Sequence, residues 1–577
     1  MSTRTTSERG SVSPVQLVST DGAVLAIFGV TFAIGAAIVL WILRLRVGVF
    51  EFEDLPIYFS LFVLQDYWPA VVGLIVVALA LLRPIQQVSV SLVEAIGSRP
   101  VLTSVTWLAV LALGARYAYH DHPLSMDEYS AYFQSQVFAA GHLSGRFPVE
   151  LLDWLVPPGF QNVFLVVSQT TGDVASVYLP GFALILTPFA LIGLPWLCNP
   201  VLGAVSLIVL HRLAMGLFGN VRLAGLVMLI AAASSAFSVN AMSYYSMTAH
   251  ALANGCFALL LLHPSVARCL LAGVVGSIAL VLHNPLPHTL FALPWLVWLA
   301  LRNDRLRTLP AIAAGYLPLF LVLGVGWTHF AADLRMVAAP IGEASANVIE
   351  RWSTALRDFL EVPSPDLLFV RTIGLAKLWI WSAPVLLAAA IAGTWYGWPD
   401  YRLRLLALSC LTTLVGFLFV VFSQGHGWGF RYFHSAWLCL PLLAAAFVRG
   451  PATERPAEPH TTFSYVAAVA VLSLTLLLPL QVWQVHGFIA RHLKQLPSSR
   501  EGAPRLVIVK PEMGYYAADL VQNDPFLRQP VIRMLSHGRA ADAAMVRQHF
   551  PELSRLSSSY RGEVWGIGRT QEPATRE

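Results

Sequence analysis

Charged residues are scarce in this chain. Only 12% of its 577 residues are Asp, Glu, Lys or Arg, whereas 56% are hydrophobic. A soluble globular chain usually carries about 25% charged residues, so the composition predicts an integral membrane protein. The formal charge of +5 comes from arginines in the connections between apolar runs. No basic stripe with interleaved aromatic residues is present, and we do not expect a nucleic-acid partner.

Cysteine and the familiar catalytic motifs are also sparse or missing. No two cysteines form a CxxC pair, which argues against a disulfide framework and a structural zinc site. The sequence contains no internal repeat, GxGxxG, P-loop or HExxH motif, and these are the usual signals of dinucleotide, phosphate-loop and zinc-hydrolase sites. The five cysteines lie in or beside apolar segments: Cys198, Cys256, Cys269, Cys410 and Cys439.

Apolar runs of membrane length dominate what is present. A run of roughly 17 to 22 apolar residues can cross a hydrocarbon core of about 30 Å. The segment 178–197 contains three prolines, which break a helix, so we expect it to re-enter the membrane or to form two half-helices. We therefore predict about 13 crossings. The candidate runs are 22–43, 65–82, 101–118, 178–197, 199–217, 222–240, 246–263, 267–283, 288–301, 308–327, 373–394, 404–422, 433–448 and 462–482.

Arginine in short connections predicts the orientation, because such residues prefer the cytoplasmic side. The strongest marker is "RNDRLR" at 302–307. It places the N-terminus inside and the C-terminus outside. The unusual polar segments then share the outer surface, which predicts extracytoplasmic chemistry. These segments are Asp127-Glu128, "SYYS" (243–246), "HNPLPH" (283–288), the loop at 328–372 and "SQGHGWGFRYFH" (423–434).

The chain divides into four predicted parts. Residues 1–21 form a cytoplasmic tail, and 22–100 form two N-terminal spans. Residues 101–485 form the main membrane domain, with extracytoplasmic loops at 119–177 and 328–372. From 495 to 577 the pattern changes to strands (505–510, 530–537 and 562–568) alternating with helices (511–524 and 539–551). Such alternation is typical of a small parallel α/β domain, here outside the membrane.

The segment "HPLSMDEYSAYFQSQVFAAGHL" (122–143) places two carboxylates directly after an apolar run. A structural interpretation is that Ser125 caps a helix and Glu128 completes a capping box. Asp127 would then favour the helix dipole, and an apolar stripe would lie on the membrane surface. The capping box itself needs only Glu128, however, and does not explain why a second carboxylate, Asp127, stands beside it.

The same segment resembles the first extracytoplasmic loop of GT-C-type membrane glycosyltransferases, which include protein O-mannosyltransferases and aminoarabinose transferases. Three later segments are similar to parts of these enzymes: "YLPGFALILTPFALIGLPWLCNPVLGAVSLIVLHRLAMGLFG", "SYYSMTAHALANGCFALLLL" and "GHGWGFRYFHSAWLCLPLL". The resemblance covers roughly residues 100 to 450. The chain departs from the family in its two extra N-terminal spans and its α/β tail.

The resemblance implies an all-α polytopic membrane fold and a bacterial inner-membrane location. It also implies a polyprenyl-phosphate-linked sugar donor, with Asp127 as the catalytic base and Glu128 beside it. The acceptor is left open as a lipid, a glycan or a protein. Because a carboxylate base must be ionised, the position of Asp127 at a helix N-terminus suits this role.

The leaving phosphate would need cationic partners. Arg431 suits this role because a guanidinium grips phosphate oxygens with two bonds, and His426 lies in the same Gly-rich segment. The alternative for Arg431 is a snorkelling interfacial arginine. Aromatic candidates for contacts with sugar or acceptor could instead belong to a membrane belt. They are Trp428, Tyr432, Tyr244, Tyr245 and Trp154.

No cofactor is required by this chemistry, but a divalent metal ion would neutralise phosphate charge. His283 and His288 are the metal-ligand candidates, although their spacing equally fits a turn.

Three other classes of protein stay open. A transporter or flippase of lipid-linked sugars would fit the number of spans, but the scarcity of mid-membrane charges favours chemistry at the surface. An O-antigen ligase or polymerase handles similar lipids. A non-catalytic scaffold of GT-C type is the third alternative.

Overall fold

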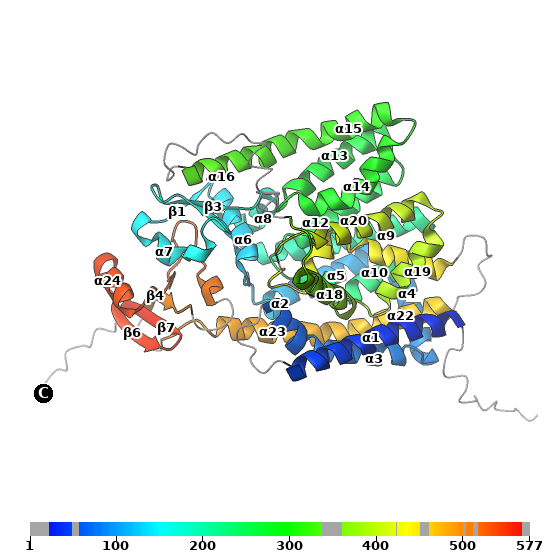
Figure 1. The fold of residues 1–577 in the computed structure, drawn as a ribbon, viewed down its shortest axis with the longest axis horizontal. Helices are drawn as coiled ribbons and strands as arrows, with labels where there is room; N and C mark the ends of the chain where they lie inside the picture. The colour runs from blue at the N-terminus through cyan, green and yellow to red at the C-terminus, as the bar shows by residue number, and fades with distance from the viewer. Residues whose placement is uncertain are drawn as a thin grey trace, which may run out of the picture.

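The computed structural model describes residues 22–48, 57–336, 360–422, 424–450, 461–499, 503–511 and 517–567. The predicted tail 1–21 and most of the predicted loop at 328–372 lie outside these ranges. The described chain is mostly helical, with a small sheet in the C-terminal region, as predicted. A second small sheet, within residues 145–176, was not predicted. Figure 1 shows the C-terminal strands at one end of the helical bundle, near α6 (Met126–Ala139), α7 (Leu152–Leu155) and the strands β1 and β3 (Gly145–Arg146 and Asp173–Ser176).

Six described helices are long and apolar enough to cross a membrane, which supports a multi-pass membrane protein. A seventh span is formed if the bent pair Ile57–Gln65 and Tyr67–Leu79, which meet at 46°, counts as one. The other apolar helices have 10–17 residues, shorter than the ~20 residues that a span needs. The predicted count of about 13 crossings is therefore not confirmed. The six are Gly22–Val47, Pro100–Ala118, Pro195–Phe218, Arg305–Arg335, Tyr401–Leu418 and Thr461–Leu493.

All described α-helices except α24 (Arg539–His549) precede the C-terminal region. They are α1 (Gly22–Gly48), α2 (Ile57–Ser60), α3 (Tyr67–Leu79), α4 (Arg83–Ser98), α5 (Pro100–Leu113), α6 (Met126–Ala139), α7 (Leu152–Leu155), α8 (Gly181–Leu191), α9 (Cys198–Phe218), α10 (Val221–Ala233), α11 (Ser235–Asn240), α12 (Met247–Leu261), α13 (Val266–Val281), α14 (Leu286–Ala300), α15 (Arg305–Leu319), α16 (Gly326–Met336), α18 (Pro365–Ile380), α19 (Leu386–Gly397), α20 (Tyr401–Leu418), α21 (Cys439–Arg449), α22 (Thr461–Leu472) and α23 (Leu478–Leu493).

Short π-helical and 3₁₀ turns join several of these helices. The π-helical turns are η2 (Leu61–Gln65), η3 (Gly114–Ala118), η7 (Phe320–Val325) and η9 (Ser473–Leu477). The 3₁₀ turns are η4 (Val149–Leu151), η5 (Pro158–Phe160), η6 (Pro195–Leu197), η8 (Arg431–Ala436) and η10 (Ala517–Leu520). A small antiparallel sheet follows α6 and has the order β1-β3-β2, built from β1 (Gly145–Arg146), β2 (Leu165–Val167) and β3 (Asp173–Ser176).

The proline-rich segment 178–197 does not form a continuous span. It folds as the 11-residue helix α8, which includes Pro188, followed by a turn at Gly193 with a φ of 72°. A helix of this length is too short to cross the hydrocarbon core. The segment therefore agrees with the expectation of a broken or re-entrant element.

The C-terminal region contains a four-stranded sheet of order β5-β4-β7-β6. Its strands are β4 (Ala503–Val509), β5 (Ile532–Leu535), β6 (Ser554–Ser559) and β7 (Gly562–Ile567), and α24 (Arg539–His549) follows β5. The strands β4 and β5 are parallel, but β7 pairs antiparallel with both β4 and β6. The expectation of a three-stranded parallel sheet was wrong, because the polar edge strand β6 has no apolar alternation and a tight hairpin imposes antiparallel pairing. The helix predicted over 511–524 is described only from residue 517, where η10 occupies part of it.

The C-terminal domain docks on the first two turns of α6. The Met126 N–H donates to Asp519 Oδ1 over 3.2 Å. The Tyr129 hydroxyl exchanges two hydrogen bonds with the backbone of Asn523, at 2.5 and 2.8 Å. Apolar side chains from both regions share one core, including Phe133 of α6 and Ile508 of β4. The domain is therefore part of the frame that holds α6.

A buried ion pair attaches the N-terminal spans to the rest of the bundle. Asp66, at the bend between η2 and α3, pairs with Lys377 of α18, and each side chain is only 1% exposed. Trp381 Nε1–H donates to the other carboxylate oxygen over 2.9 Å. A carboxylate with these partners tolerates burial that it would not tolerate alone.

We predict that Lys377→Ala destabilises the protein by about 3–5 kcal/mol, because it leaves the Asp66 carboxylate buried without its cation. Thermal unfolding of the detergent-purified protein measures the effect. The double variant Asp66→Leu/Lys377→Met should regain most of the loss. The control is Arg222→Ala, which breaks an exposed pair with Glu94 and should cost less than about 1 kcal/mol. Equal losses in Lys377→Ala and the control would contradict the prediction.

Candidate functional site

The helix α6 begins with the predicted capping box, which the structure confirms. Ser125 has extended backbone geometry at the N-cap, and the backbone N–H groups of Leu124 and Ser125 donate to Glu128 Oε2 over 2.8 and 3.3 Å. A capping box satisfies N–H groups that the first turn of a helix leaves unpaired. The start of α6 is therefore set by the local sequence.

Glu128 does more than cap its own helix. Its side chain is fully buried, and its Oε1 accepts hydrogen bonds from the Tyr119 hydroxyl and the Tyr244 N–H, each at 2.9 Å. Burial raises the pKa of Glu128 to about 7, even though its four hydrogen-bond donors favour the ionised form. Glu128 thus ties α6 to the end of α5 and to the turn after α11.

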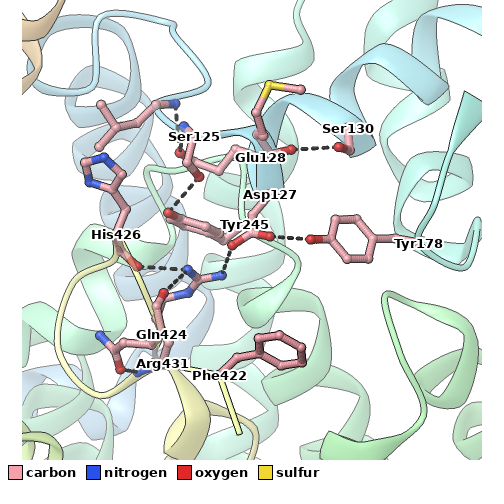
Figure 2. A network of polar contacts seen from close by, with 12 residues as sticks. Ser125, Asp127, Glu128, Ser130, Tyr178, Tyr245, Phe422, Gln424, His426 and Arg431 are labelled. Atoms are coloured by element: carbon pink, nitrogen blue, oxygen red, sulfur yellow. Dashed lines mark hydrogen bonds and ion pairs between the residues drawn. The ribbon is translucent and has the colours of Figure 1, made fainter. Parts of the chain in front are cut away.

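Asp127 points away from this network toward a cation. Its Oδ2 lies 2.9 Å from Arg431 Nη2, and its Oδ1 accepts a hydrogen bond from the Tyr178 hydroxyl (Figure 2). The side chain remains 24% exposed. Burial raises the pKa of Asp127, but Arg431, His283 and the Tyr178 hydrogen bond outweigh burial, so the net pKa lies below its usual value. Asp127 is therefore an ionised and partly accessible carboxylate.

Arg431 is held by the Gly-rich loop that precedes η8. Its Nη1 donates to the carbonyl oxygens of Gln424 and His426 over 2.7 and 2.8 Å, and its guanidinium carbon lies 4.0 Å from the centre of the Tyr245 ring (Figure 2). Gly427 has a φ of 126°, and a Cβ there would lie 2.0 Å from Arg431 Cδ. Glycine is thus needed at this position, because any larger residue would collide with the Arg431 side chain where it packs against the loop.

Two features of Arg431 suit it to bind an anion. Its Nε atom is buried and has no hydrogen-bond partner in the described part of the chain. Its pKa is raised, because attraction to Tyr245 and Asp127 outweighs the lowering effect of burial. A permanently charged guanidinium with a spare N–H next to an exposed carboxylate can exchange that carboxylate for a phosphate.

Other predicted site residues lie in or beside this cluster. The His283 ring lies 3.8 Å from the Tyr178 ring, centre to centre, and burial lowers the pKa of His283 to about 4. His426 contributes its backbone carbonyl to Arg431. Tyr245 packs under Arg431 and its hydroxyl lies 3.0 Å from Ser125 Oγ, whereas Tyr244 binds Asp121 Oδ1 over 2.6 Å.

Three predicted aromatic residues have other surroundings. Trp428 is 1% exposed, donates to the Tyr119 hydroxyl and packs against other rings, so it offers no open face to a sugar. Tyr432 stacks on Phe417 with ring centres 4.8 Å apart. Trp154 lies at the docking surface of the C-terminal domain, where Nε1 approaches Asp542 Oδ1 at 3.4 Å.

The predicted metal ligands do not form a metal cluster. Within the residues that the structure describes, no group of three or more His, Cys, Asp or Glu side chains is arranged to hold an ion. His288 uses both ring nitrogens, one with Asn254 Oδ1 and one with the Tyr316 hydroxyl, each at 2.7 Å. His288 therefore has no free ring nitrogen for a metal in this arrangement.

The sequence did not reveal several residues that shape the site. Tyr178 binds Asp127 across 51 positions of sequence, and Tyr119 binds Glu128 from the end of the preceding span. Gln424 orients Arg431 by accepting its backbone N–H over 2.9 Å. Single tyrosines and glutamines carry no spacing signal, so only the folded arrangement identifies them.

Comparison with known proteins gives a limited likeness. No protein-family model matches the chain, and no curated protein matches its sequence. Crystal structures of ArnT from Cupriavidus metallidurans resemble the fold, one bound to undecaprenyl phosphate (TM-score 0.47) and one in the apo state (0.44). Both share 13% sequence identity and match 81% of this chain and 97% or 98% of theirs. Likeness at this level does not establish a family for the chain.

We predict a pH-dependent effect of Glu128→Gln on stability. The pKa of Glu128 is about 7 in the folded protein and about 4.3 in the unfolded chain. At a pH between these two values, the folded wild type therefore binds one proton more than the unfolded chain does. Its advantage over the variant should be largest near pH 4.5 and should shrink by about 3 kcal/mol as the pH rises to 7.

Unfolding midpoints of both proteins in detergent, measured from pH 4.5 to 8, test this. The matched control is Glu150→Gln, which changes an exposed acid in η4. Its unfolding midpoint should differ from that of the wild type by the same amount at every pH. A constant difference for Glu128→Gln as well would contradict the raised pKa.

Proposed function

We propose that the protein is an integral-membrane glycosyltransferase that moves a sugar from a polyprenyl-phosphate donor to an extracytoplasmic acceptor with inversion. The observation that carries the proposal is the ion pair between Asp127 and Arg431, with Tyr178 on the second carboxylate oxygen. It pairs an accessible base with a phosphate-binding cation in a multi-pass helical protein. The resemblance noted in the sequence supports the same chemistry.

The proposed reaction is a single displacement. An acceptor hydroxyl oxygen attacks the anomeric carbon of the sugar, and Asp127 takes the hydroxyl proton as the new bond forms. The bond between the anomeric carbon and the phosphate oxygen breaks, and the phosphate keeps the electron pair. Arg431 stabilises the charge that develops on this phosphate. Because the acceptor attacks opposite the leaving group, the configuration inverts.

In the free protein, however, Arg431 weakens Asp127 as a base, because the ion pair lowers the pKa of the carboxylate. A donor phosphate that binds Arg431 through Nε and Nη2 would displace the carboxylate from the guanidinium. The pKa of Asp127 would then rise, and the carboxylate would become a better base once the donor is in place. Donor binding and base activation are thus linked by one arginine.

The positive charge for the leaving phosphate comes from the chain itself, so the proposal includes no cofactor. The location in a bacterial-type inner membrane rests on the resemblance noted in the sequence, and the outward-facing site rests on the distribution of arginine in the connections. The identity of the sugar and of the acceptor stays open to a lipid, a glycan or a protein.

A second candidate is a transporter or flippase of lipid-linked sugars. The buried pair of Asp66 and Lys377 favours it, because ionised residues inside membrane spans often belong to transport pathways. This pair is satisfied by Trp381 as well, and both of its side chains are only 1% exposed, whereas the Asp127 carboxylate is partly accessible. We therefore place the glycosyltransferase first.

We predict that Asp127→Asn lowers the turnover number about 10²–10⁴-fold, the usual contribution of a general base. Purified protein is incubated with a panel of polyprenyl-phosphate sugars and cell-envelope acceptors, and prenyl-phosphate release is measured. Asp173→Asn, at a partly exposed acid bound to Thr171 and Ser144, is the control and should keep full activity. An Asp127→Asn protein with normal release would exclude the mechanism. Movement of intact donor across a vesicle membrane without release would support the transporter.

We also predict that Tyr178→Phe shifts the acidic limb of the pH–rate profile to higher pH. The Tyr178 hydroxyl lowers the pKa of Asp127, so its loss should raise the pH at which the base becomes ionised. The value of kcat/KM is measured from about pH 3 to 8, so that the range includes the limb of the wild type. The matched control, Tyr432→Phe, removes a hydroxyl that donates to the Phe422 carbonyl rather than to Asp127. Identical limbs in wild type and Tyr178→Phe would show that this hydroxyl does not tune the base.

A further inference from the structure

An apolar groove of about 380 Å³ lies between the N-terminal spans and the last span. One wall comes from α2 and η2, and the other from α23. Leu64 and Trp483 on its rim are 50% and 70% exposed, so the groove opens on the outer surface of the helical bundle. The lining residues are Ile57, Ser60, Leu61, Leu64, Gln65, Trp483, Gln484, Gly487, Phe488 and Arg491.

The groove contains a small set of polar groups with unused bonding capacity. Gln484 Nε2 donates to the Gln65 carbonyl over 2.9 Å, but Gln484 Oε1 and Gln65 Nε2 are buried without partners among the described residues. Arg491 stands in the last turn of α23, and its guanidinium makes no hydrogen bond or ion pair that the described chain provides. An apolar channel with one uncommitted cation matches a lipid that has an anionic head.

The groove is separated from the candidate site by one layer of side chains. Phe488 lines the groove, and its ring centre lies 5.5 Å from that of His426 and 5.9 Å from that of Trp428. The His426 carbonyl in turn accepts the hydrogen bond from Arg431. A ligand in the groove therefore contacts Phe488, whose ring packs on the loop that positions Arg431.

A second apolar groove, of about 400 Å³, lies on another side of this loop, between α18 and α20. Its cation, Arg371, already donates to the carbonyl oxygens of Phe417, Val420 and Phe422 and stacks on the Tyr432 ring at 4.8 Å. Most donors of Arg371 are thus committed to the backbone. Charge complementarity to a lipid phosphate therefore favours the groove that contains Arg491.

We propose that the groove between η2 and α23 binds a polyprenyl phosphate, with Arg491 as the phosphate partner and Gln65 and Gln484 beside it. The proposal rests on the proposed function for the choice of lipid, because the donor and the released product share this chemistry. A groove of about 380 Å³ with a single arginine in its lining suits one prenyl chain better than a phospholipid with two acyl chains. The N-terminal spans would thereby hold the lipid next to the loop of Arg431.

Native mass spectrometry of the full-length protein with a long-chain polyprenyl phosphate tests the proposal without any need for turnover. Arg491→Ala should raise the dissociation constant about tenfold, because it removes one charge-assisted contact. Gly487→Leu should have a similar effect by filling the groove, since a Cβ at this position lies no nearer than 3.5 Å to any neighbour. A photoreactive analogue should label the segments 57–65 and 483–491.

Two matched controls should bind like the wild type. Arg547→Ala removes an exposed arginine on α24, and Gly29→Leu adds a side chain on α1 where a Cβ meets nothing within 4 Å. Unchanged binding by Arg491→Ala and Gly487→Leu would overturn the proposal, and so would equal displacement by phosphatidylglycerol.

The outcome is separable from that of the proposed function, because Asp127→Asn should lose transfer yet keep the part of lipid binding that depends on Arg491. If the protein binds the lipid through Arg491 but has no transferase activity, the lipid site in the groove is supported and only the proposed glycosyltransferase function is excluded.

Discussion

The orientation of the whole site depends on the buried carboxylate of Glu128. Its four donors come from the loop before α6, from the end of the α5 span and from the turn after α11. A buried carboxylate without such donors would cost several kcal/mol, so these segments cannot separate without a large loss of stability. Because Asp127 immediately precedes Glu128 on the same helical turn, fixing Glu128 also fixes the direction in which Asp127 points.

The two neighbouring acids therefore have different tasks set by their environments. Glu128 is fully buried and has a raised pKa, whereas Asp127 keeps 24% of its side chain exposed and has a lowered pKa. Burial raises the pKa of Glu128, whereas at Asp127 the contact with Arg431, together with His283 and Tyr178, outweighs burial. Two carboxylates whose pKa values are pushed apart in this way are typical of catalytic sites, where one group supports and the other reacts.

Local rules predicted part of this arrangement from the sequence. The capping box, the broken segment around Pro188 and most of the C-terminal strands follow from spacing, proline chemistry and hydrophobic patterning. The sequence also identified Asp127 and Arg431 as a carboxylate and a cation at one rim, 304 positions apart. It could not predict their direct contact, nor the hydroxyl of Tyr178, because these depend on how α6, α8 and the loop at 424–431 pack. The polar edge strand β6 was missed since its serines have no apolar alternation.

The C-terminal domain is coupled to the same electrostatics. Asp519 of η10 accepts the backbone N–H of Met126, and its other oxygen, Oδ2, is buried with no partner in the described chain. Burial raises the pKa of Asp519, and the charges of Asp127 and Glu128 raise it further. Three carboxyl groups thus surround the first turn of α6, and Arg431 is paired with only one of them. A second negative charge at Asp519 would be costly, so the domain docks most favourably when that carboxyl is protonated. An anion that binds Arg431 would leave the Asp127 carboxylate without its cation. Because Asp127 is adjacent to Met126, whose N–H binds Asp519, the unpaired charge would lie next to the contact that docks the C-terminal domain.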